Sequence, residues 1–301
     1  MLELKLHSEC IACQVQVRFK DLQRVITDES KRFSLMIKVL NLLMKEVEER
    51  GRDITPTHLG TKLFRFIKIV TGISDPYEDE KRRECINGLK LYNVLNKELK
   101  SLDVMSRVVK CIKLALIGNA LDLGVAGYIP PNTQYILKES EVIKIRECDI
   151  ELILKMFKKA RIISFILDNT GEAVFDKLLS ESVRNLKTYT IAIVKSGAFQ
   201  NDITIKEAEY LELSSSFDEV LETGTDAASI FLEELTPRVK RAINESDVLI
   251  SKGMANFEYL SEVDEVINKP IIYMLKAKCR PVAKELGVNV GDYVLRTKIK
   301  S

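Results

Sequence analysis

The sequence predicts an α/β fold, on the basis of a change in the spacing of apolar residues along the chain. Over residues 8–113, apolar residues recur at intervals of three or four, which is the helical period. Beyond residue 160, short apolar runs alternate with amphipathic stretches of helical length, as in parallel sheets with crossover helices. We therefore expect an all-helical region at residues 1–114. A three-layer α/β/α, Rossmann-like domain with a mostly parallel sheet is expected at residues 115–301.

Several helices, separated by recognisable breaks, are expected in the first region. Residues 33–44 carry one continuous apolar face. A new helix is expected at Thr55-Pro56, because proline is favoured in the first helical turn. Asp75-Pro76, just before a strongly charged segment, is expected to be a helix stop and restart. Amphipathic helix is expected again over residues 91–102 and 104–114.

Four apolar runs in the second region are the predicted strands, at residues 162–167, 190–194, 248–250 and 271–275. Each run ends in polar or glycine-containing residues, with the sequences DNTGE, KSGAFQND, SKGMAN and KAKC in that order. In open parallel sheets, ligands bind beyond the carboxyl ends of the strands. We therefore expect these four strand ends to converge on one functional crevice.

Oxygen ligands follow the first two strands. Asp168 and Asn169 come directly after the first, and Asp202 precedes the helix after the second. Carboxylate and amide oxygens suit Mg²⁺ or Mn²⁺, with Co²⁺ or Ni²⁺ as alternatives. We predict that the three side chains hold one divalent ion and leave positions for water and substrate. Helix capping is the competing interpretation, and Thr204 with Glu207 predicts a capping box at the next helix.

Basic and amide side chains near the other strand ends suit a phosphate. Lys252 is expected directly after the third strand, where its ammonium group and backbone amides face one anion. Lys276 and Lys278 could add positive charge; solvation is the alternative, and is favoured more for Lys278. Asn119 and Asp122 share one side of a helix if their segment is helical, and both could then reach the metal's water or the substrate. The alternative for Asn119 is a buried amide that satisfies the neighbouring backbone.

A metal ion beside lysines is suited to transferring a phosphoryl group to water. Attack by Asp168 and attack by water are both open. The D-x-D-x-T signature of haloacid dehalogenases is absent, which favours water.

Charge and hydropathy argue against two other classes of function. The chain has 46 Lys plus Arg and 44 Asp plus Glu, without a long block of one sign, so nucleic-acid binding gains no support. No apolar run approaches the length that crosses a membrane, and the first residues lack an apolar signal segment. We expect a soluble, cytoplasmic protein.

Six cysteines in 301 residues are too sparse for a secreted disulfide scaffold, which favours a reducing compartment. Cys10 and Cys13 form a C-x-x-C that could be half of a zinc site or a redox pair. A closed zinc site would need Cys85 or Cys279 from far along the chain. A sulfur site of Cys10, Cys13 and Cys279 is therefore one possibility, and its existence depends on whether the three thiols meet.

Seven motifs occur in a characteristic order: C-x-x-C, SDPY, GNALDLG, ILDNTGE, VKSGAFQNDIT, SDVLISKGMANFE and LKAKCRPVA. From Cys10 to about Val294, the chain resembles the metal-dependent damage-control phosphatases, especially their compact archaeal and bacterial members. The resemblance implies a helical region on an α/β/α domain and a small phosphorylated metabolite as substrate, such as a sugar phosphate or a phosphopantetheine-type compound. Thr170 and Ala198 depart from the family pattern, in which a smaller residue and proline are common, but neither change removes a ligand.

The resemblance also implies roles for individual residues. Asp168, Asn169 and Asp202 would bind the divalent metal, and the phosphosubstrate pocket would be lined by Asn119, Asp122, Glu172, Lys252, Asn256 and Lys276.

The sequence thus predicts a metal-dependent phosphomonoester hydrolase in which Asp168 and Asp202 are catalytic. One alternative is a non-catalytic module that binds a metabolite or a metal. Another is an S-adenosylmethionine-dependent methyltransferase, which would share the Rossmann-like sheet, although the expected glycine-rich loop is missing. The physiological substrate and the oligomeric state are left open.

Overall fold

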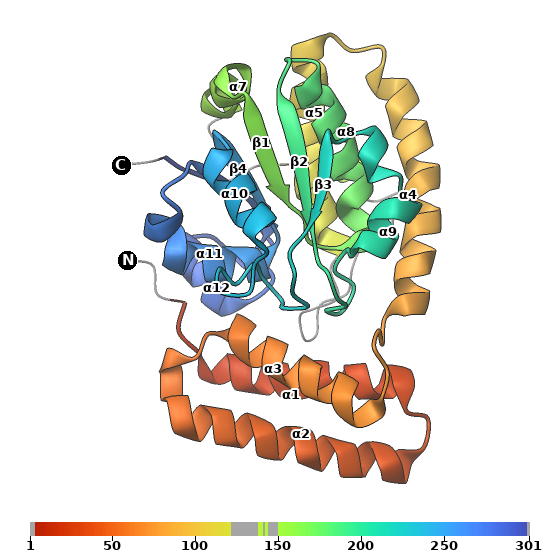
Figure 1. Ribbon diagram of the computed structural model, residues 1–301, viewed down its shortest axis with the longest axis vertical. Coiled ribbons are helices and arrows are strands. Elements are labelled where there is room, and N and C mark those ends of the chain that lie inside the picture. Colours follow the sequence, from red (N-terminus) through yellow and green to blue (C-terminus); the bar gives the residue numbers. More distant parts are fainter. Residues whose placement is uncertain (1–3, 122–137, 141, 144–149, 300–301) are drawn as a thin grey trace.

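The computed structural model describes residues 4–121, 138–140, 142–143 and 150–299. A central sheet lies between two layers of helices, and a further helical layer lies across one end of the sheet (Figure 1). The strand order is β3-β2-β1-β4-β5-β6, and every neighbouring pair is parallel except β5 and β6. The strands are β1 (Ile162–Ile166), β2 (Tyr189–Val194), β3 (Glu219–Glu222), β4 (Val248–Lys252), β5 (Ile271–Lys276) and β6 (Tyr293–Lys298).

The predicted fold class is confirmed, but the sheet has two strands more than predicted and one strand ends later than predicted. Strand β3 and the antiparallel edge strand β6 were not predicted from the sequence. Strand β4 runs two residues further than predicted, so Lys252 is its last residue and does not follow it. In register, Ile166 of β1 pairs with Ile193 and Ser251 on its two neighbours. The ends of β1, β2 and β4 are therefore level, and the residues that follow β1 and β2 meet at one edge of the sheet.

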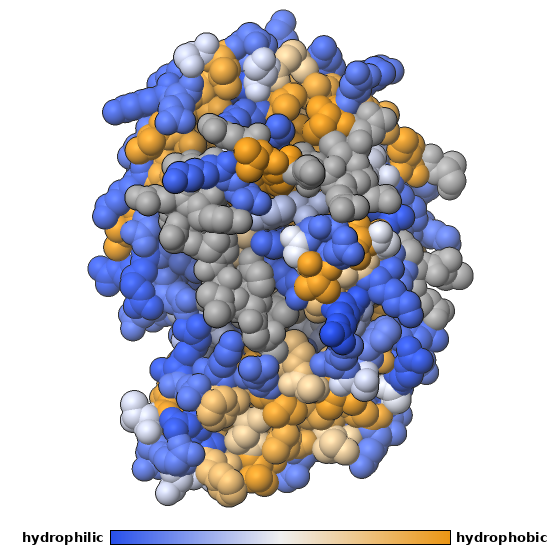
Figure 2. Space-filling view, turned by 180° about the vertical axis from the view of Figure 1, so that it is seen from behind, coloured by the Kyte–Doolittle hydropathy of each residue, from blue (hydrophilic) through white to orange (hydrophobic). Residues whose placement is uncertain are grey.

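Helices α1 (Ser8–Val25), α2 (Glu29–Arg50) and α3 (Pro56–Thr71) form the layer across the end of the sheet and have a hydrophobic core of their own. The predicted start at Thr55 is confirmed, since its hydroxyl accepts from the His58 amide and Pro56 occupies the first turn. On the face hidden in Figure 1, apolar side chains gather over this layer (Figure 2). Within the described residues, no helix is both long and apolar enough to cross a membrane.

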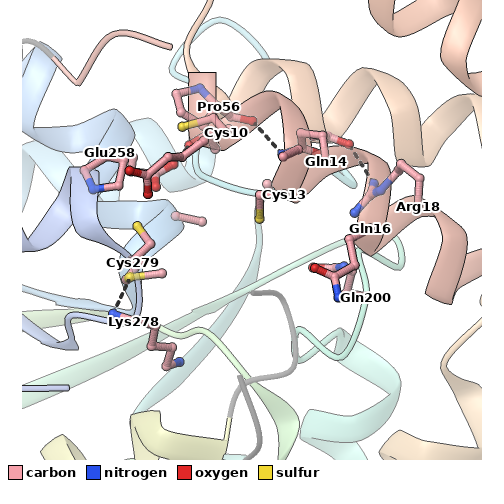
Figure 3. A pocket seen from close by; sticks show the side chains of 18 of the residues that line it. Cys10, Cys13, Gln14, Gln16, Arg18, Pro56, Gln200, Glu258, Lys278 and Cys279 are labelled. Atoms are coloured by element: carbon pink, nitrogen blue, oxygen red, sulfur yellow. Dashed lines mark hydrogen bonds between the residues drawn. The ribbon is translucent and has the colours of Figure 1, made fainter. Parts of the chain in front are cut away.

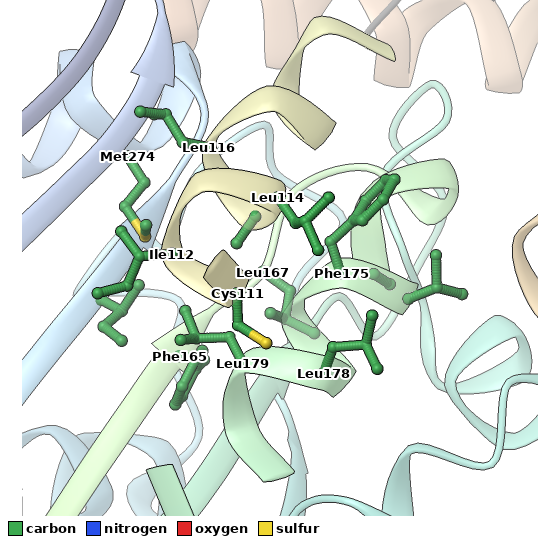
Figure 4. Packing of buried hydrophobic residues seen from close by; sticks show 14 of the residues in the cluster. Cys111, Ile112, Leu114, Leu116, Phe165, Leu167, Phe175, Leu178, Leu179 and Met274 are labelled. Carbon is green, nitrogen blue, oxygen red and sulfur yellow. The ribbon is translucent and has the colours of Figure 1, made fainter. Parts of the chain in front are cut away.

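Helix α5 (Val104–Gly118) packs on the sheet, and helix α4 (Glu78–Leu99) packs on other helices of that face, while Glu80 near its start pairs with Arg24 of α1. Both helices share one core with α7 (Ile150–Lys159), α8 (Ala173–Arg184) and α9 (Ile205–Tyr210) on the same face. Figure 4 shows Ile112 and Leu116 of α5 packed among Phe165, Leu178 and Met274. The helical half of the sequence is thus divided between two cores, and the domain boundary at residue 114 stays a prediction.

The opposite face of the sheet is covered by α10 (Pro237–Glu245), α11 (Met254–Ile267) and α12 (Arg280–Leu286), which form a second core with it. Both α11 and α12 begin beside the edge of the sheet where β1, β2 and β4 end. The starts of these two helices therefore help to surround the crevice.

Candidate active site

The segments after β1 and β2 bring the three predicted metal ligands onto adjoining turns. The Ile203 amide donates to the Asp168 carbonyl at 2.8 Å, and Asn169 and Asp202 form an antiparallel bridge. The exposed fractions of Asp168, Asn169 and Asp202 are 5%, 1% and 6%. Three polar side chains from two strand ends are thus nearly removed from solvent at one place.

Asn169 also starts a helix, as the capping interpretation predicts. It forms a capping box with Glu172 at the 3₁₀ turn Thr170–Glu172, which leads into α8. The backbone amide of Asn169 donates to Glu172 Oε1 at 3.1 Å. The capping box predicted at Thr204 and Glu207 is confirmed at the start of α9. Capping and metal binding are compatible, because an amide oxygen has two lone pairs.

The donors in this site fit a hard divalent ion. Asp168 and Asp202 offer carboxylate oxygens and Asn169 an amide oxygen, the ligand types of Mg²⁺ and Mn²⁺. The backbone also makes room for Asp168. Gly253 has φ of +81°, and a Cβ there would lie 1.9 Å from Asp168 Oδ2. Only glycine permits this close approach.

Lys195 adds an ammonium group that the sequence analysis left without a role. It is 3% exposed, and its Nζ lies 3.6 Å from Asp202 Oδ2. Burial lowers the pKa of Lys195, while the carboxylates of Asp202 and Asp168 oppose that shift. The sequence could have indicated this role for Lys195, because it is the first residue after β2. Since two carboxylates face this single ammonium group, the local charge favours an additional cation.

A buried ionic cluster lies behind Asp168. Lys252 Nζ donates at 2.7 Å to Glu172 Oε2 and at 2.7 Å to Asp176 Oδ1, and all three side chains are fully buried. Burial alone would lower the pKa of Lys252, but the two carboxylates raise it above its usual value. Burial raises the pKa of Asp176 to about 7. Burial acts in the same direction on Glu172, but Lys252 outweighs it and lowers the pKa of Glu172.

Asn119 joins this cluster to Asp168. Its Nδ2 lies 3.0 Å from both Asp168 Oδ2 and Glu172 Oε1, and its Oδ1 accepts from the Lys276 amide at 3.0 Å. Asn119 is therefore a buried amide with partners, as the alternative interpretation held, and one partner is Asp168. The predicted companion of Asn119, Asp122, lies outside the described residues.

Two further predicted pocket residues have defined partners. Asn256 is fully buried; its Nδ2 donates to the Lys252 carbonyl at 2.9 Å, and its Oδ1 accepts from Ser229. Lys276 Nζ lies 4.7 Å from the centre of the Tyr293 ring. Burial lowers the pKa of Lys276, and the neighbouring charge of Lys278 adds to that effect.

A cavity of about 680 Å³ lies between the helical layer and the ends of the strands (Figure 3). Asp168, Asp202 and Lys278 line it, together with residues of α1, α3, α11 and α12. Lys278 is only 6% exposed, so the alternative of a solvated lysine does not hold there. The five described residues that the resemblance implied for the substrate pocket do not border this cavity. They are Asn119, Glu172, Lys252, Asn256 and Lys276.

The helical layer contributes polar groups to the cavity that the sequence analysis missed. Arg18 of α1 is 2% exposed, lines the cavity and donates to the Gly60 carbonyl at 3.0 Å. The layer is tied to the α/β domain by Arg65, whose Nε lies 2.7 Å from Asp226 Oδ1, and by Lys68, which donates to the Ala198 carbonyl. An arginine on an amphipathic helix resembles any surface charge in sequence, so no local pattern identifies Arg18.

Cys10, Cys13 and Cys279 line the same cavity. The side chains of Cys13 and Cys279 point into it from α1 and from the start of α12 (Figure 3). Across the described part of the chain, no three His, Cys, Asp or Glu side chains are grouped so as to hold a metal ion. The predicted set of Asp168, Asn169 and Asp202 includes only two residues of these types. A zinc site at the three cysteines gains no support.

Alkylation of Cys10 and Cys279 is expected to be slow. Burial raises the pKa of Cys10 to about 11 and that of Cys279 to about 12, so both thiols are protonated near neutral pH. At pH 7.5, iodoacetamide should modify Cys10 on the order of a hundredfold more slowly than a free cysteine, and the rate should rise with pH. Peptide-resolved mass spectrometry measures both rates, with the chain in guanidinium as control. Equal rates in folded and unfolded protein would contradict the expectation.

Comparisons with known proteins agree with this architecture. Residues 6–294 match the damage-control phosphatase ARMT1-like domain. A damage-control phosphatase of Pyrococcus horikoshii is 31% identical over 299 residues, covering 99% of this chain and 100% of that protein. A damage-control phosphatase of Archaeoglobus fulgidus is 28% identical over 295 residues, covering 97% and 99%.

A solved structure is similar over the same length. It is the crystal structure of a DUF89 family protein from Pyrococcus horikoshii, with a TM-score of 0.86 and 29% sequence identity, covering 98% of this chain and 100% of that one. The helical layer and the α/β/α domain therefore recur together in a solved protein. Because the family domain spans nearly the whole sequence, this chain belongs to the damage-control phosphatase family.

Proposed function

We propose that this chain is a divalent-metal-dependent phosphatase that hydrolyses small phosphorylated metabolites. Family membership supports the phosphatase role. The observation that carries the metal assignment is the pair of carboxylates, Asp168 and Asp202, that lines a cavity at the carboxyl edge of a parallel sheet.

In this proposal Asp168, Asn169 and Asp202 hold the ion, which is Mg²⁺, Mn²⁺, Co²⁺ or Ni²⁺. When bound, the ion polarises the phosphate group and makes water a better nucleophile. Asp168 serves as a ligand and not as the attacking group. The turn at Gly253 leaves room for the Asp168 carboxylate, because any side chain there would occupy the same space.

Positive charge at the cavity completes the proposed site. Lys278 is buried at the cavity wall, where its ammonium group can neutralise charge on the phosphate oxygens. Lys195 lies beside Asp202 and limits repulsion between the two carboxylates before an ion binds. Arg18 adds a guanidinium group on the helical side of the cavity, although it is also paired with the buried Asp21 at 3.0 Å.

The cavity also supports a substrate larger than its phosphate group. Its volume of about 680 Å³ falls within the usual range for sites of small organic ligands. Thiols and apolar groups contribute to its wall beside the charged residues, including Cys13, Cys279, Pro281 and Val290. We propose sugar phosphates and phosphopantetheine-type compounds as the substrate classes to compare.

Release of inorganic phosphate tests this function. Enzyme stripped by a chelator should be inactive on a panel of sugar phosphates and phosphopantetheine derivatives, and addition of Mg²⁺, Mn²⁺, Co²⁺ or Ni²⁺ should restore turnover. The relative kcat/KM values would then separate the two substrate classes. Folded protein that is inactive with every ion and substrate, but binds one of the compounds by calorimetry, would favour the non-catalytic binding module.

A further inference from the structure

Lys252 has no donor left for a substrate. A lysine ammonium group has three N–H donors. Lys252 Nζ is within hydrogen-bonding distance of three acceptors: the Ala115 carbonyl at 2.9 Å, Glu172 Oε2 at 2.7 Å and Asp176 Oδ1 at 2.7 Å. The side chain is 0% exposed and does not border the cavity. Contact with a phosphate would require breaking a buried ion cluster in which all three donors of Lys252 are used.

The carboxylate that Lys252 holds organises two amides. One oxygen of Glu172 accepts from Lys252, and the other, Oε1, accepts from Asn119 Nδ2 and Asn169 Nδ2, each at 3.0 Å. The Asn169 backbone amide donates to the same atom. Lys252 thereby fixes the orientation of Glu172, and Glu172 that of the two asparagines.

Both asparagines direct their remaining amide hydrogen at Asp168. Asn119 Nδ2 lies 3.0 Å and Asn169 Nδ2 2.8 Å from Asp168 Oδ2. Both hydrogens of Asn169 Nδ2 are used in this way, and its amide oxygen accepts from the Glu172 backbone amide in the capping box, so the orientation of the whole amide group is fixed. The hydrogen bonds thus run without a break from Lys252 to the proposed ligands Asp168 and Asn169.

We propose that Lys252 is a positioning residue for the metal site, acting through Glu172, and that it does not bind the phosphate of the substrate. The inference rests on the proposed metal site at Asp168, Asn169 and Asp202. Outer partners that orient ligands typically change metal affinity by about 10- to 100-fold when they are removed. A cation is favoured at this position because an ionised Glu172 buried without one would be strongly unfavourable.

Separate measurements of metal and phosphate binding test the proposal. Lys252→Met keeps the length of the side chain and removes its charge. Calorimetric titration of the metal-free protein with Mn²⁺ should show an affinity about 10- to 100-fold weaker than that of the wild type. At saturating Mn²⁺, the affinity for inorganic phosphate should change less than about twofold. Unchanged Mn²⁺ affinity with weakened phosphate binding would overturn the proposal.

Lys177→Met is the matched control. Lys177 is a lysine of α8 that is 3% exposed, and it donates to the Leu211 and Glu212 carbonyls away from the site. The control should lose stability but bind Mn²⁺ like the wild type. A loss of Mn²⁺ affinity equal to that of Lys252→Met would mean that any buried lysine has this effect, and would overturn the proposal.

A double-variant comparison tests the route through Glu172, and it also serves if Lys252→Met does not fold. Glu172→Gln preserves the shape of the side chain and should by itself weaken Mn²⁺ binding while sparing phosphate binding. If Lys252 acts through Glu172, adding Lys252→Met to Glu172→Gln should weaken Mn²⁺ binding little further, whereas additive losses would contradict that route. These titrations do not depend on turnover, so failure of the phosphatase assay and failure of this proposal are distinguishable.

Discussion

Replacing Asp168 by asparagine is expected to lower kcat for phosphate release by about a thousandfold, the scale on which loss of electrostatic stabilisation slows enzymes. The substitution keeps the size of the side chain and removes the charge that would hold the ion. It also places an amide where Asn119 and Asn169 now donate to Asp168 Oδ2, which disturbs both neighbours. Asp202→Asn should have an effect of the same order. Steady-state assays at saturating Mn²⁺ measure both.

Asp247→Asn is a suitable control for these variants. Asp247 lies at the opposite end of the sheet, where its carboxylate accepts from the Arg161 and Ile162 amides at the start of β1. Its substitution should leave kcat within about twofold and lower stability by about 1 kcal/mol, the usual contribution of a hydrogen bond. More than a tenth of wild-type kcat in both Asp168→Asn and Asp202→Asn, with folded proteins, would contradict their assignment as metal ligands.

The elements that the sequence predicts well are those whose apolar pattern depends only on local periodicity. The first strand is buried on both faces, so its run of apolar residues identified it. Strand β3 has four residues, two of them glutamates, and no such run marks it. Helices α4 and α5 were identified as helices, but an amphipathic pattern does not specify which core a helix joins.

The candidate site also contains some residues that the sequence predicts and some contacts that it does not. The sequence could predict the set of Asp168, Asn169 and Asp202, because the carboxyl ends of parallel strands lie at one edge of the sheet. This rule requires no knowledge of which residues are in contact. The partners of Lys252 could not be predicted, since Glu172 and Asp176 are 80 and 76 residues away in sequence. The sequence therefore identified a lysine near the site, and only the structure showed that its charge is already paired.

Gly253→Ala is expected to reduce both stability and activity. At φ of +81° an alanine is strained, and such positions typically contribute about 1–3 kcal/mol of instability. In addition, the new Cβ would lie 1.9 Å from Oδ2 and 2.3 Å from Cγ of Asp168, so that carboxylate has to move. Displacement of a reacting group by about 1 Å can slow an enzyme about a hundredfold. We expect a loss of that order in kcat, together with weaker Mn²⁺ binding.

Gly51→Ala separates backbone strain from displacement of Asp168. Gly51 ends α2 with φ of +57°, and a Cβ there would have no neighbour within 4 Å. Urea unfolding should show a loss of stability in both variants, larger in Gly253→Ala because of the added contact with Asp168, whereas only Gly253→Ala should lose activity and Mn²⁺ affinity. If Gly253→Ala binds Mn²⁺ and turns over like Gly51→Ala, the Asp168 carboxylate tolerates displacement, and its position is not what the glycine preserves. Loss confined to Gly253→Ala would instead link the turn between β4 and α11 directly to the metal ligand that it faces.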